Sequence, residues 1–319
     1  MGSKITVKRR VENAANLDKI YGEFIRHKQA LNLSADTISN YNRTYNMFAS
    51  WYGRGDTAGI NVPLIDDFII ALNDGTRHIA SVNHYIRDLR TFLYWCMDSG
   101  YISPPFKVAV LRGQETEKPT LTDDEVAALL VKPARRCAFA EYRSWVVVNW
   151  LLATGNRAST ICAVQLGDLD FNRREITLTH TKNKQAQIIP MSAALESVLR
   201  TYIRTWRYGE EADAPLFCAV DGAPLTRGSL RLSINRYMKG RGVDKTGVHI
   251  FRHTYARLWI TEGDGNLFKL QKMLGHSTLK MTQHYAHIYA QDLHDGFEAA
   301  NPLDCLLRDN AKSNVIRRK

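Results

Sequence analysis

The sequence lacks the marks of a secreted or membrane-spanning protein. Its 319 residues include only five cysteines, an odd number without any CxxC spacing. They stand apart from one another at Cys96, Cys137, Cys162, Cys218 and Cys305. This pattern argues against a disulfide framework or a zinc knuckle and is typical of a reducing, cytoplasmic compartment. No apolar run reaches the length of about 18 residues that suggests a membrane span, and the polar start of the chain shows no signal segment.

Acidic residues are scarcer than basic ones. The 43 Lys and Arg outnumber the 32 Asp and Glu, which gives a formal net charge of +11. Such an excess attracts polyanions over a long range, so nucleic acid is the first candidate partner and an anionic membrane surface the second. A basic protein without any polyanionic partner is the alternative, because the sign of the charge does not determine the fold.

Helical patterns fill the first hundred residues. The predicted helices span residues 16–31, 35–52, 63–73 and 77–98. Apolar side chains recur in them at helical spacing, which predicts inward positions even for Leu31, Trp51 and Ile79, and Ser34 stands where an N-cap would. We therefore expect a helical domain over residues 14–105.

The outward faces of these helices are basic. They carry Arg43, Arg77, Arg87 and Arg90. Such side chains are candidate contacts to DNA phosphates. For each of them taken alone, an ordinary solvated position is the alternative.

A linker is predicted at residues 106–120. Pro104, Pro105 and Pro119 surround a charged run there, which is typical of a loop. Thr122 and Glu125 then form a capping-box pattern ahead of an apolar helix, which indicates the start of a second domain.

The second domain, residues 121–300, is predicted to be mainly helical with a small antiparallel sheet. The apolar run Trp145–Ala153 predicts a buried helix that ends at Gly155. Residues 175–180 and 187–190 read as two strands, joined by a polar turn over 181–185. Further helices are expected at residues 195–208, 229–240 and 249–262. The fold class is thus mainly α, with a helical first domain and a mixed α/β second domain.

Two arginines are candidates for binding a phosphate. Arg252 lies within an apolar helical pattern, and a buried guanidinium needs an anion or another acceptor. Arg157 follows the turn that Gly155 makes after the buried helix. Two converging arginines would bind the non-bridging oxygens of one phosphate. An internal ion pair with Asp or Glu is the alternative for either residue alone.

Several other side chains could supply the remaining chemistry. Tyr285 is a phenol that nearby cations would activate as a nucleophile, and Lys182 at the predicted turn could protonate a leaving oxygen. His249 and His276 could transfer protons or donate to a phosphate. A core tyrosine and a solvated lysine are the alternatives for the first two. The histidines, with His253, His284 and His287, could instead hold a metal ion, but no supporting carboxylate or cysteine spacing accompanies them.

Together these segments resemble the tyrosine recombinase family, also called the phage-integrase or Xer-like family. The resemblance rests on six positions in order, within Thr154-Gly155-Asn156-Arg157, Thr181-Lys182, His249-Ile250-Phe251-Arg252-His253, Leu274-Gly275-His276-Ser277 and Tyr285. It covers roughly residues 14 to 300.

The resemblance implies a site-specific DNA recombinase with the following roles. Arg157 and Arg252 would clamp the scissile phosphate, while His276 would hydrogen-bond to it. Lys182 would be the general acid for the 5′-hydroxyl, His249 would assist proton transfer, and Tyr285 would form a 3′-phosphotyrosine bond. Strand exchange would then need no metal, cofactor or ATP.

The resemblance also implies a set of partners. The first domain would be the family's SAM-like core-binding domain on double-stranded DNA, with Lys184 of the turn as a further candidate contact. The protein would be a monomer in free solution and a homotetramer at a Holliday junction. The tail, residues 301–319, would dock on a neighbouring protomer or on its own domain.

The chain departs from the family pattern at two positions. Thr160 stands where an acidic residue is common, and Phe251 where leucine is usual. A DNA-binding protein that uses this fold without cleaving, and a type IB topoisomerase, are the competing functions. The DNA site and the biological task, whether integration, excision, inversion or resolution, do not follow from the sequence.

Overall fold

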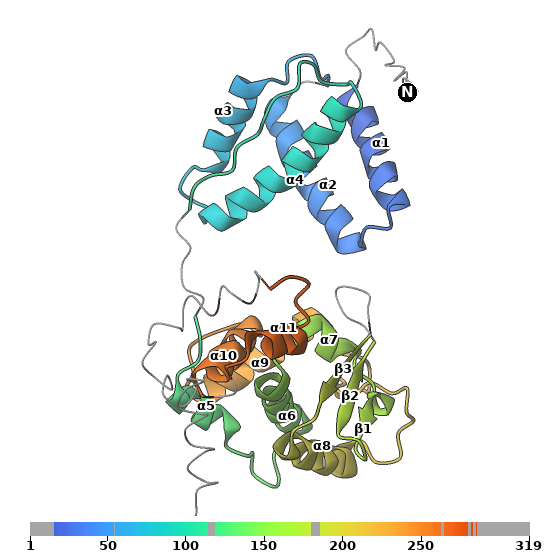
Figure 1. Cartoon of the computed structure of the whole chain (residues 1–319), viewed down its shortest axis with the longest axis vertical. Coiled ribbons are helices and arrows are strands. Elements are labelled where there is room, and N and C mark those ends of the chain that lie inside the picture. Colours follow the sequence, from blue (N-terminus) through green and yellow to red (C-terminus); the bar gives the residue numbers. More distant parts are fainter. Residues whose placement is uncertain are drawn as a thin grey trace, which may run out of the picture. The chain divides into compact units, whose positions relative to one another are not determined.

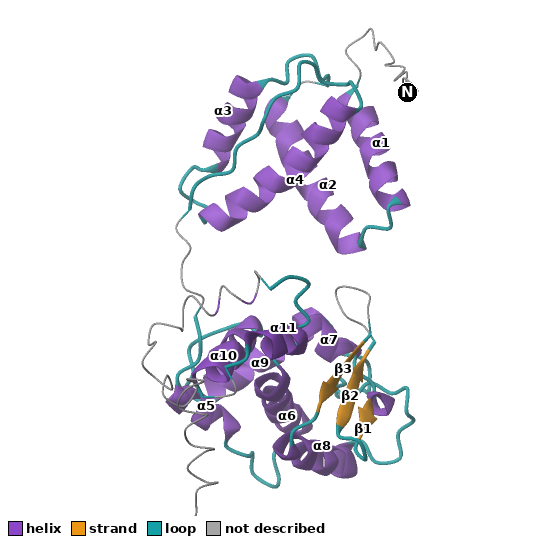
Figure 2. Ribbon diagram, viewed as in Figure 1, coloured by secondary structure: helices purple, strands orange, loops and turns teal. Residues whose placement is uncertain are grey.

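The computed structural model describes residues 16–53, 55–113, 119–179, 186–262, 265–279, 282 and 285. The chain divides into two compact units, Met1–Thr116 and Glu117–Lys319 (Figure 1). The described part of the first unit is helices and loops, whereas the second combines helices with a small sheet (Figure 2). The predicted fold class, mainly α with a small antiparallel sheet, is confirmed.

Helices α1 to α4 form the first unit. They span Leu17–Ala30 (α1), Ala35–Tyr52 (α2), Val62–Leu72 (α3) and Ile79–Asp98 (α4). The Ser34 side chain accepts a hydrogen bond from the backbone N–H of Thr37, as predicted for the N-cap of α2. Aromatic side chains dominate the core. Tyr21 and Tyr45 stack with their ring centroids 3.6 Å apart, and Phe92 meets both rings edge-on.

Three predicted core positions of this unit are wrong. Leu31, Trp51 and Ile79 are 57%, 39% and 38% exposed, respectively. All three stand at helix ends, since Leu31 is the C-cap of α1, Trp51 is the next-to-last residue of α2 and Ile79 is the first residue of α4. The ends are not uniformly exposed, since Tyr52, the last residue of α2, is buried and Trp51 contacts the Phe68 ring with 5.1 Å between the centroids.

The first half of the expected linker packs on α4 instead of standing free. The Asn83 side chain exchanges two hydrogen bonds with the backbone of Leu111, at 2.8 and 3.0 Å. The Tyr94 hydroxyl accepts a hydrogen bond from the Val108 N–H, and Val108 is buried. Residues up to Leu111 therefore belong to the first unit, because side chains of α4 supply the backbone partners that a regular element would otherwise provide.

The second unit surrounds helix α6. Its elements are α5 (Asp123–Leu130), α6 (Phe139–Thr154), α7 (Ala158–Ala163), β1 (Leu169–Asp170), β2 (Glu175–Leu178), β3 (Gln187–Pro190), α8 (Ala193–Trp206), α9 (Arg227–Gly240), α10 (His249–Thr261) and α11 (Leu267–Leu274). Helix α6 packs against α5, α8, α9 and α10, so it is apolar on nearly all sides (Figure 1). The capping box of Thr122 and Glu125 at the start of α5 is present as predicted. Elements β1, α7 and α11 were not predicted from the sequence.

The sheet has the order β1-β2-β3, with antiparallel neighbours throughout. Ile176 of β2 pairs with Ile189 of β3, and both side chains are buried against the helical core. The turn predicted between β2 and β3 lies outside the described residues. No helix within the described part of the chain is both long and apolar enough to cross a membrane.

Candidate active site

Arg252 is anchored by the ends of two helices. Its Nη1 donates to the carbonyl of Gly155, the C-cap of α6, at 2.9 Å, and its Nη2 donates to the carbonyl of Leu274, the last residue of α11, at 2.8 Å. Helix C-termini carry partial negative charge, so they compensate a buried cation. Among the described residues no carboxylate pairs with Arg252, so the internal ion pair that the sequence left open is replaced by two carbonyls.

The electrostatics of the site favour an anion. Burial and, next, the charge of Arg157 lower the pKa of Arg252 to about 10, while Tyr285 acts in the opposite direction. Burial also lowers the pKa of Arg157, which Tyr285 again opposes. Two partly desolvated cations beside one phenol repel each other, so an anion bound between them would relieve the repulsion.

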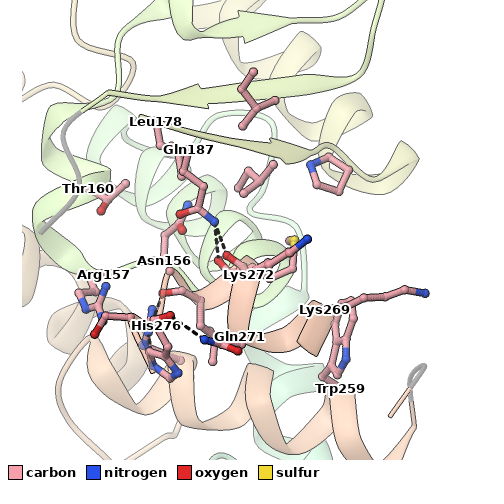
Figure 3. Close-up of a pocket in the computed structure, with 18 of the residues that line it drawn as sticks. Asn156, Arg157, Thr160, Leu178, Gln187, Trp259, Lys269, Gln271, Lys272 and His276 are labelled. Carbon is pink, nitrogen blue, oxygen red and sulfur yellow. Dashed lines mark hydrogen bonds between the residues drawn. The ribbon is translucent and has the colours of Figure 1, made fainter. Parts of the chain in front are cut away.

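Arg157 is positioned by the turn between α6 and α7. Gly155 adopts a left-handed conformation with φ +61° and ends α6, and Arg157 then serves as the N-cap residue of α7. Within the described residues the Arg157 guanidinium makes no hydrogen bond or ion pair. The side chain is half-buried and borders a cavity, so its donors are available to a ligand (Figure 3).

His276 is held between Arg252 and Thr282. Its Nε2 lies 2.7 Å from Nη2 of Arg252, and its Nδ1 lies 2.8 Å from Oγ1 of Thr282. Because a guanidinium can only donate, Nε2 must accept, and the proton of the neutral ring stands on Nδ1 and is donated to Thr282. Thr282 is fully buried and lies three residues before Tyr285.

Tyr285 lies with its hydroxyl inside this group. Its side chain is 4% exposed and packs with Tyr255, Leu270 and Leu274. The Tyr285 hydroxyl lies 2.8 Å from Nδ1 of His253. The ring is parallel to that of His276, within 2°, with 6.4 Å between the centroids.

A cavity of about 980 Å³ opens beside these residues. Its walls come from the α6–α7 turn, from β3, and from α11 with the following Gly275–Ser277 turn (Figure 3). Gln187 at the start of β3 donates to the carbonyl of Lys272 and, at 3.4 Å, to that of Met273, so it joins the sheet to the end of α11. Nδ2 of Asn156 is buried without a hydrogen-bond partner among the described residues.

The structure thus brings together four of the six predicted catalytic side chains. Arg157, Arg252, His276 and Tyr285 meet at one place. His249 is exposed at the first position of α10, one helical turn before Arg252 and His253. Lys182, Lys184, His284 and His287 lie outside the described residues.

Sequence reasoning missed His253, Thr282 and Gln187 as parts of this site. His253 was considered only as a metal ligand, although its spacing of four from His249 places both on one helix face. Neither Thr282 nor Gln187 carried a signal of its own in the sequence. No three His, Cys, Asp or Glu side chains gather in the described part of the chain as they would around a metal ion.

The two departures from the expected pattern are both accommodated. Thr160 is buried on α7, three residues after Arg157, and borders the same cavity. Its backbone N–H donates to the carbonyl of Arg157 at 3.0 Å. Phe251 is fully buried in the core of the second unit.

Comparison with known families decides the identity of this fold. The profile of the phage integrase family matches residues 119–292, more than half of the chain. The chain belongs to the phage integrase family. The tyrosine recombinase XerC of Corynebacterium glutamicum is 24% identical over 292 residues, which cover 90% of this chain and 93% of that protein. XerC of Bacillus subtilis is 26% identical over 302 residues, covering 92% and 98%. The resemblance to tyrosine recombinases is confirmed.

Solved structures of integrases and of a site-specific recombinase share the fold. The integrase of the transposon Tn1549, in complex with a circular intermediate DNA, superposes with a TM-score of 0.73 at 20% identity, covering 89% of this chain and 98% of that one. The XerH recombinase bound to a palindromic difH substrate gives 0.69 at 20% identity, with 85% and 82% covered. A lambda integrase tetramer bound to a Holliday junction gives 0.66 at 17% identity, with 84% and 79% covered.

Proposed function

We propose that this protein is a site-specific DNA recombinase that cuts and rejoins strands through a 3′-phosphotyrosine bond to Tyr285. The observation that carries the proposal is the meeting of Arg157, Arg252 and His276 around the Tyr285 side chain. These residues come from segments more than 90 residues apart, since Arg252 and Gly155 are separated by 97 positions. A site of this kind places a nucleophile beside a binding site for one phosphate.

Phosphate binding would use the donors that the fold leaves available. Arg157 would donate to one non-bridging oxygen, and the donors of Arg252 that do not hold the helix ends would reach the other. His276 would turn its Nε2 from Arg252 to the phosphate and donate from it, which requires the ring to gain a proton or to change its tautomer. The charge that builds up on the pentacoordinate phosphorus would then meet cations already in place.

Cleavage would then proceed in two linked events. The Tyr285 oxygen attacks phosphorus, and the 5′-oxygen leaves with a proton from Lys182, with His249 assisting proton transfer. The phosphotyrosine bond keeps the energy of the phosphodiester, so a 5′-hydroxyl of another strand can reverse the reaction without ATP. No step calls on a cofactor.

The first unit, residues 14–105, would act as the core-binding domain on double-stranded DNA. Arg43 donates to Asn40 and lies over the Tyr85 ring, and Arg77 pairs with the exposed Asp74. Exposed contacts of this kind contribute little, so these side chains could turn to DNA phosphates at small cost. Arg87 is exposed, and Arg90 lies over the Tyr94 ring. Lys184, in the β2–β3 turn, would add a contact from the catalytic domain, residues 121–300.

Assembly on DNA would involve four protomers. The lambda integrase structure is a tetramer on a Holliday junction, and that fold is shared here, which supports the same assembly for this chain. The free protein would be a monomer, and residues 301–319 would link neighbouring protomers. The cysteines fit a cytoplasmic location, where the protein would meet its DNA.

The test can be run although the target site is unidentified. A pool of random duplexes with a nick in the central region is incubated with the full chain, and DNA that stays attached in denaturing detergent is recovered and sequenced. Wild type should enrich one motif, and Tyr285→Phe should recover none. Absence of any adduct from wild type, or an adduct from Tyr285→Phe, would refute the assignment.

The same enriched site separates the competing functions. A recombinase should form a complex of two duplexes and four protomers and exchange strands between them. A type IB topoisomerase would instead relax a supercoiled plasmid as a monomer. An architectural protein would bind the DNA and never become attached to it.

A further inference from the structure

A second histidine of the α10 motif touches the hydroxyl of the proposed nucleophile. Nδ1 of His253 lies 2.8 Å from the hydroxyl oxygen of Tyr285, and the two ring centroids are 5.7 Å apart at an angle of 43°. His253 is partly buried, and the Tyr285 side chain is 4% exposed. The roles that the family resemblance implies do not include this residue.

Helix α10 gives His253 a fixed position. His249, Arg252 and His253 occupy positions i, i+3 and i+4, so they share one face of the helix. Arg252 is held by the carbonyls of Gly155 and Leu274. Because His253 directly follows this anchored residue within the helix, its ring is presented to Tyr285 from a rigid element.

We propose that His253 is a further catalytic residue, the base that takes the proton of Tyr285 during attack and returns it during rejoining. The inference rests on the proposed function. It assigns to His253 the step on the nucleophile's side and leaves Lys182 on the leaving-group side.

The proton and the bonds balance in both directions. In cleavage, the O–H bond of Tyr285 breaks and its proton moves to Nδ1 of His253, while the tyrosine oxygen bonds to phosphorus. The bond from phosphorus to the 5′-oxygen breaks, and that oxygen takes a proton from the general acid. In rejoining, the 5′-hydroxyl attacks, the tyrosine oxygen leaves, and His253 returns the proton to it.

The neighbouring groups are less suited to this role. The guanidinium groups of Arg157 and Arg252 cannot accept a proton, and both nitrogens of His276 already have partners in Arg252 and Thr282. His249 stands one turn earlier, exposed at the start of α10. The described charged and titratable groups around the pair include Arg157, Arg252, His276 and the buried Tyr255.

The first experiment separates proton transfer from positioning. In His253→Asn, the amide oxygen can stand near the place of Nδ1 and accept the hydrogen bond from Tyr285, but it cannot take the proton. Single-turnover cleavage of a nicked duplex carrying the enriched site should slow by about 100-fold, within the usual range for losing a general base. DNA affinity and the thermal midpoint should match those of wild type. His253→Gln, which places its amide near Nε2 instead, serves as the comparison.

The second experiment tests whether His253 acts on the nucleophile or on the leaving group. In a substrate with sulfur in place of the bridging 5′-oxygen, the leaving group needs no proton. Sulfur should restore cleavage to Lys182→Ala and leave the defect of His253→Asn in place. The wild-type rate should also rise with pH as one imidazole loses its proton, and this rise should disappear in His253→Asn.

The outcomes separate a failure of the role of His253 from a failure of the proposed function. Cleavage by His253→Asn at the wild-type rate, or rescue of His253→Asn by sulfur, would overturn the role of His253. A wild type that forms no adduct on any site would instead refute the proposed function, and that outcome is known before the His253 variants are measured.

Discussion

Replacing Gly155 with alanine should destabilise the second unit and disturb the site at once. Gly155 has φ +61°, a left-handed conformation in which a Cβ is strained. The added Cβ would stand 2.5 Å from Cδ1 of Tyr255 and 2.8 Å from Cδ2 of Leu274, and both residues are buried. The carbonyl of Gly155 also holds Arg252, so the displacement would move the phosphate-binding guanidinium.

The expected loss in the free energy of unfolding of Gly155→Ala has two contributions. The left-handed strain costs about 1–2 kcal/mol, and forcing a methyl group into a packed core costs about 1–3 kcal/mol more. Gly242 provides the matched control in the same unit, since it has φ +76° and no atom within 4 Å of an added Cβ. Gly242→Ala should therefore show the strain term alone.

Thermal unfolding of the full chain, followed by circular dichroism, measures the difference. For a unit of this size, 1 kcal/mol corresponds to about 2–4 °C in the unfolding midpoint. Gly155→Ala should unfold at a clearly lower temperature than Gly242→Ala, and it alone should lose DNA cleavage at temperatures where it is folded. Equal midpoints for the two variants would refute the steric reasoning, and full cleavage by Gly155→Ala would refute the coupling to Arg252.

Three further predictions test single contacts. Thr282→Val removes the hydrogen-bond partner of Nδ1 of His276. Single-turnover cleavage should slow about 10-fold, which is about the effect of losing one hydrogen bond. Thr282→Ser keeps the hydroxyl and should cleave at the wild-type rate in the same assay. Arg143 is buried and donates to the carbonyl of Cys218 at 2.6 Å. Arg143→Ala would leave that buried carbonyl without its donor, so it should lower the free energy of unfolding in urea by about 1–3 kcal/mol. A loss well below about 1 kcal/mol would count against this contact. Burial raises the pKa of the Cys96 thiol, so little reactive thiolate forms near pH 8. Iodoacetamide should therefore label Cys96 only after the first unit unfolds. Fast labelling in the native protein would contradict the burial of this side chain.

Local patterns in the sequence predicted most helices and the order of the site residues. The spans of α1 to α4 and the end of α6 follow from apolar spacing with caps such as Ser34 and Gly155, because those signals act between residues at most four apart, whereas α6 begins at Phe139, six residues before the predicted start. Helices α7 and α11 have six and eight residues, too few for periodicity to distinguish from a loop, and neither has a capping box such as the one that predicted the equally short α5.

The contacts of the site depended on tertiary structure. The sequence determined that Arg157, Arg252, His276 and Tyr285 follow one another in family order, and its composition determined the net charge of +11. It did not determine that the carbonyls at the ends of α6 and α11, in place of a carboxylate, hold Arg252. Nor did it show that His253 meets Tyr285, 32 positions away. A buried polar group must find a hydrogen-bond partner among the groups that are buried with it. Which groups these are depends on how distant segments of the chain pack together, so the tertiary structure determines the partners.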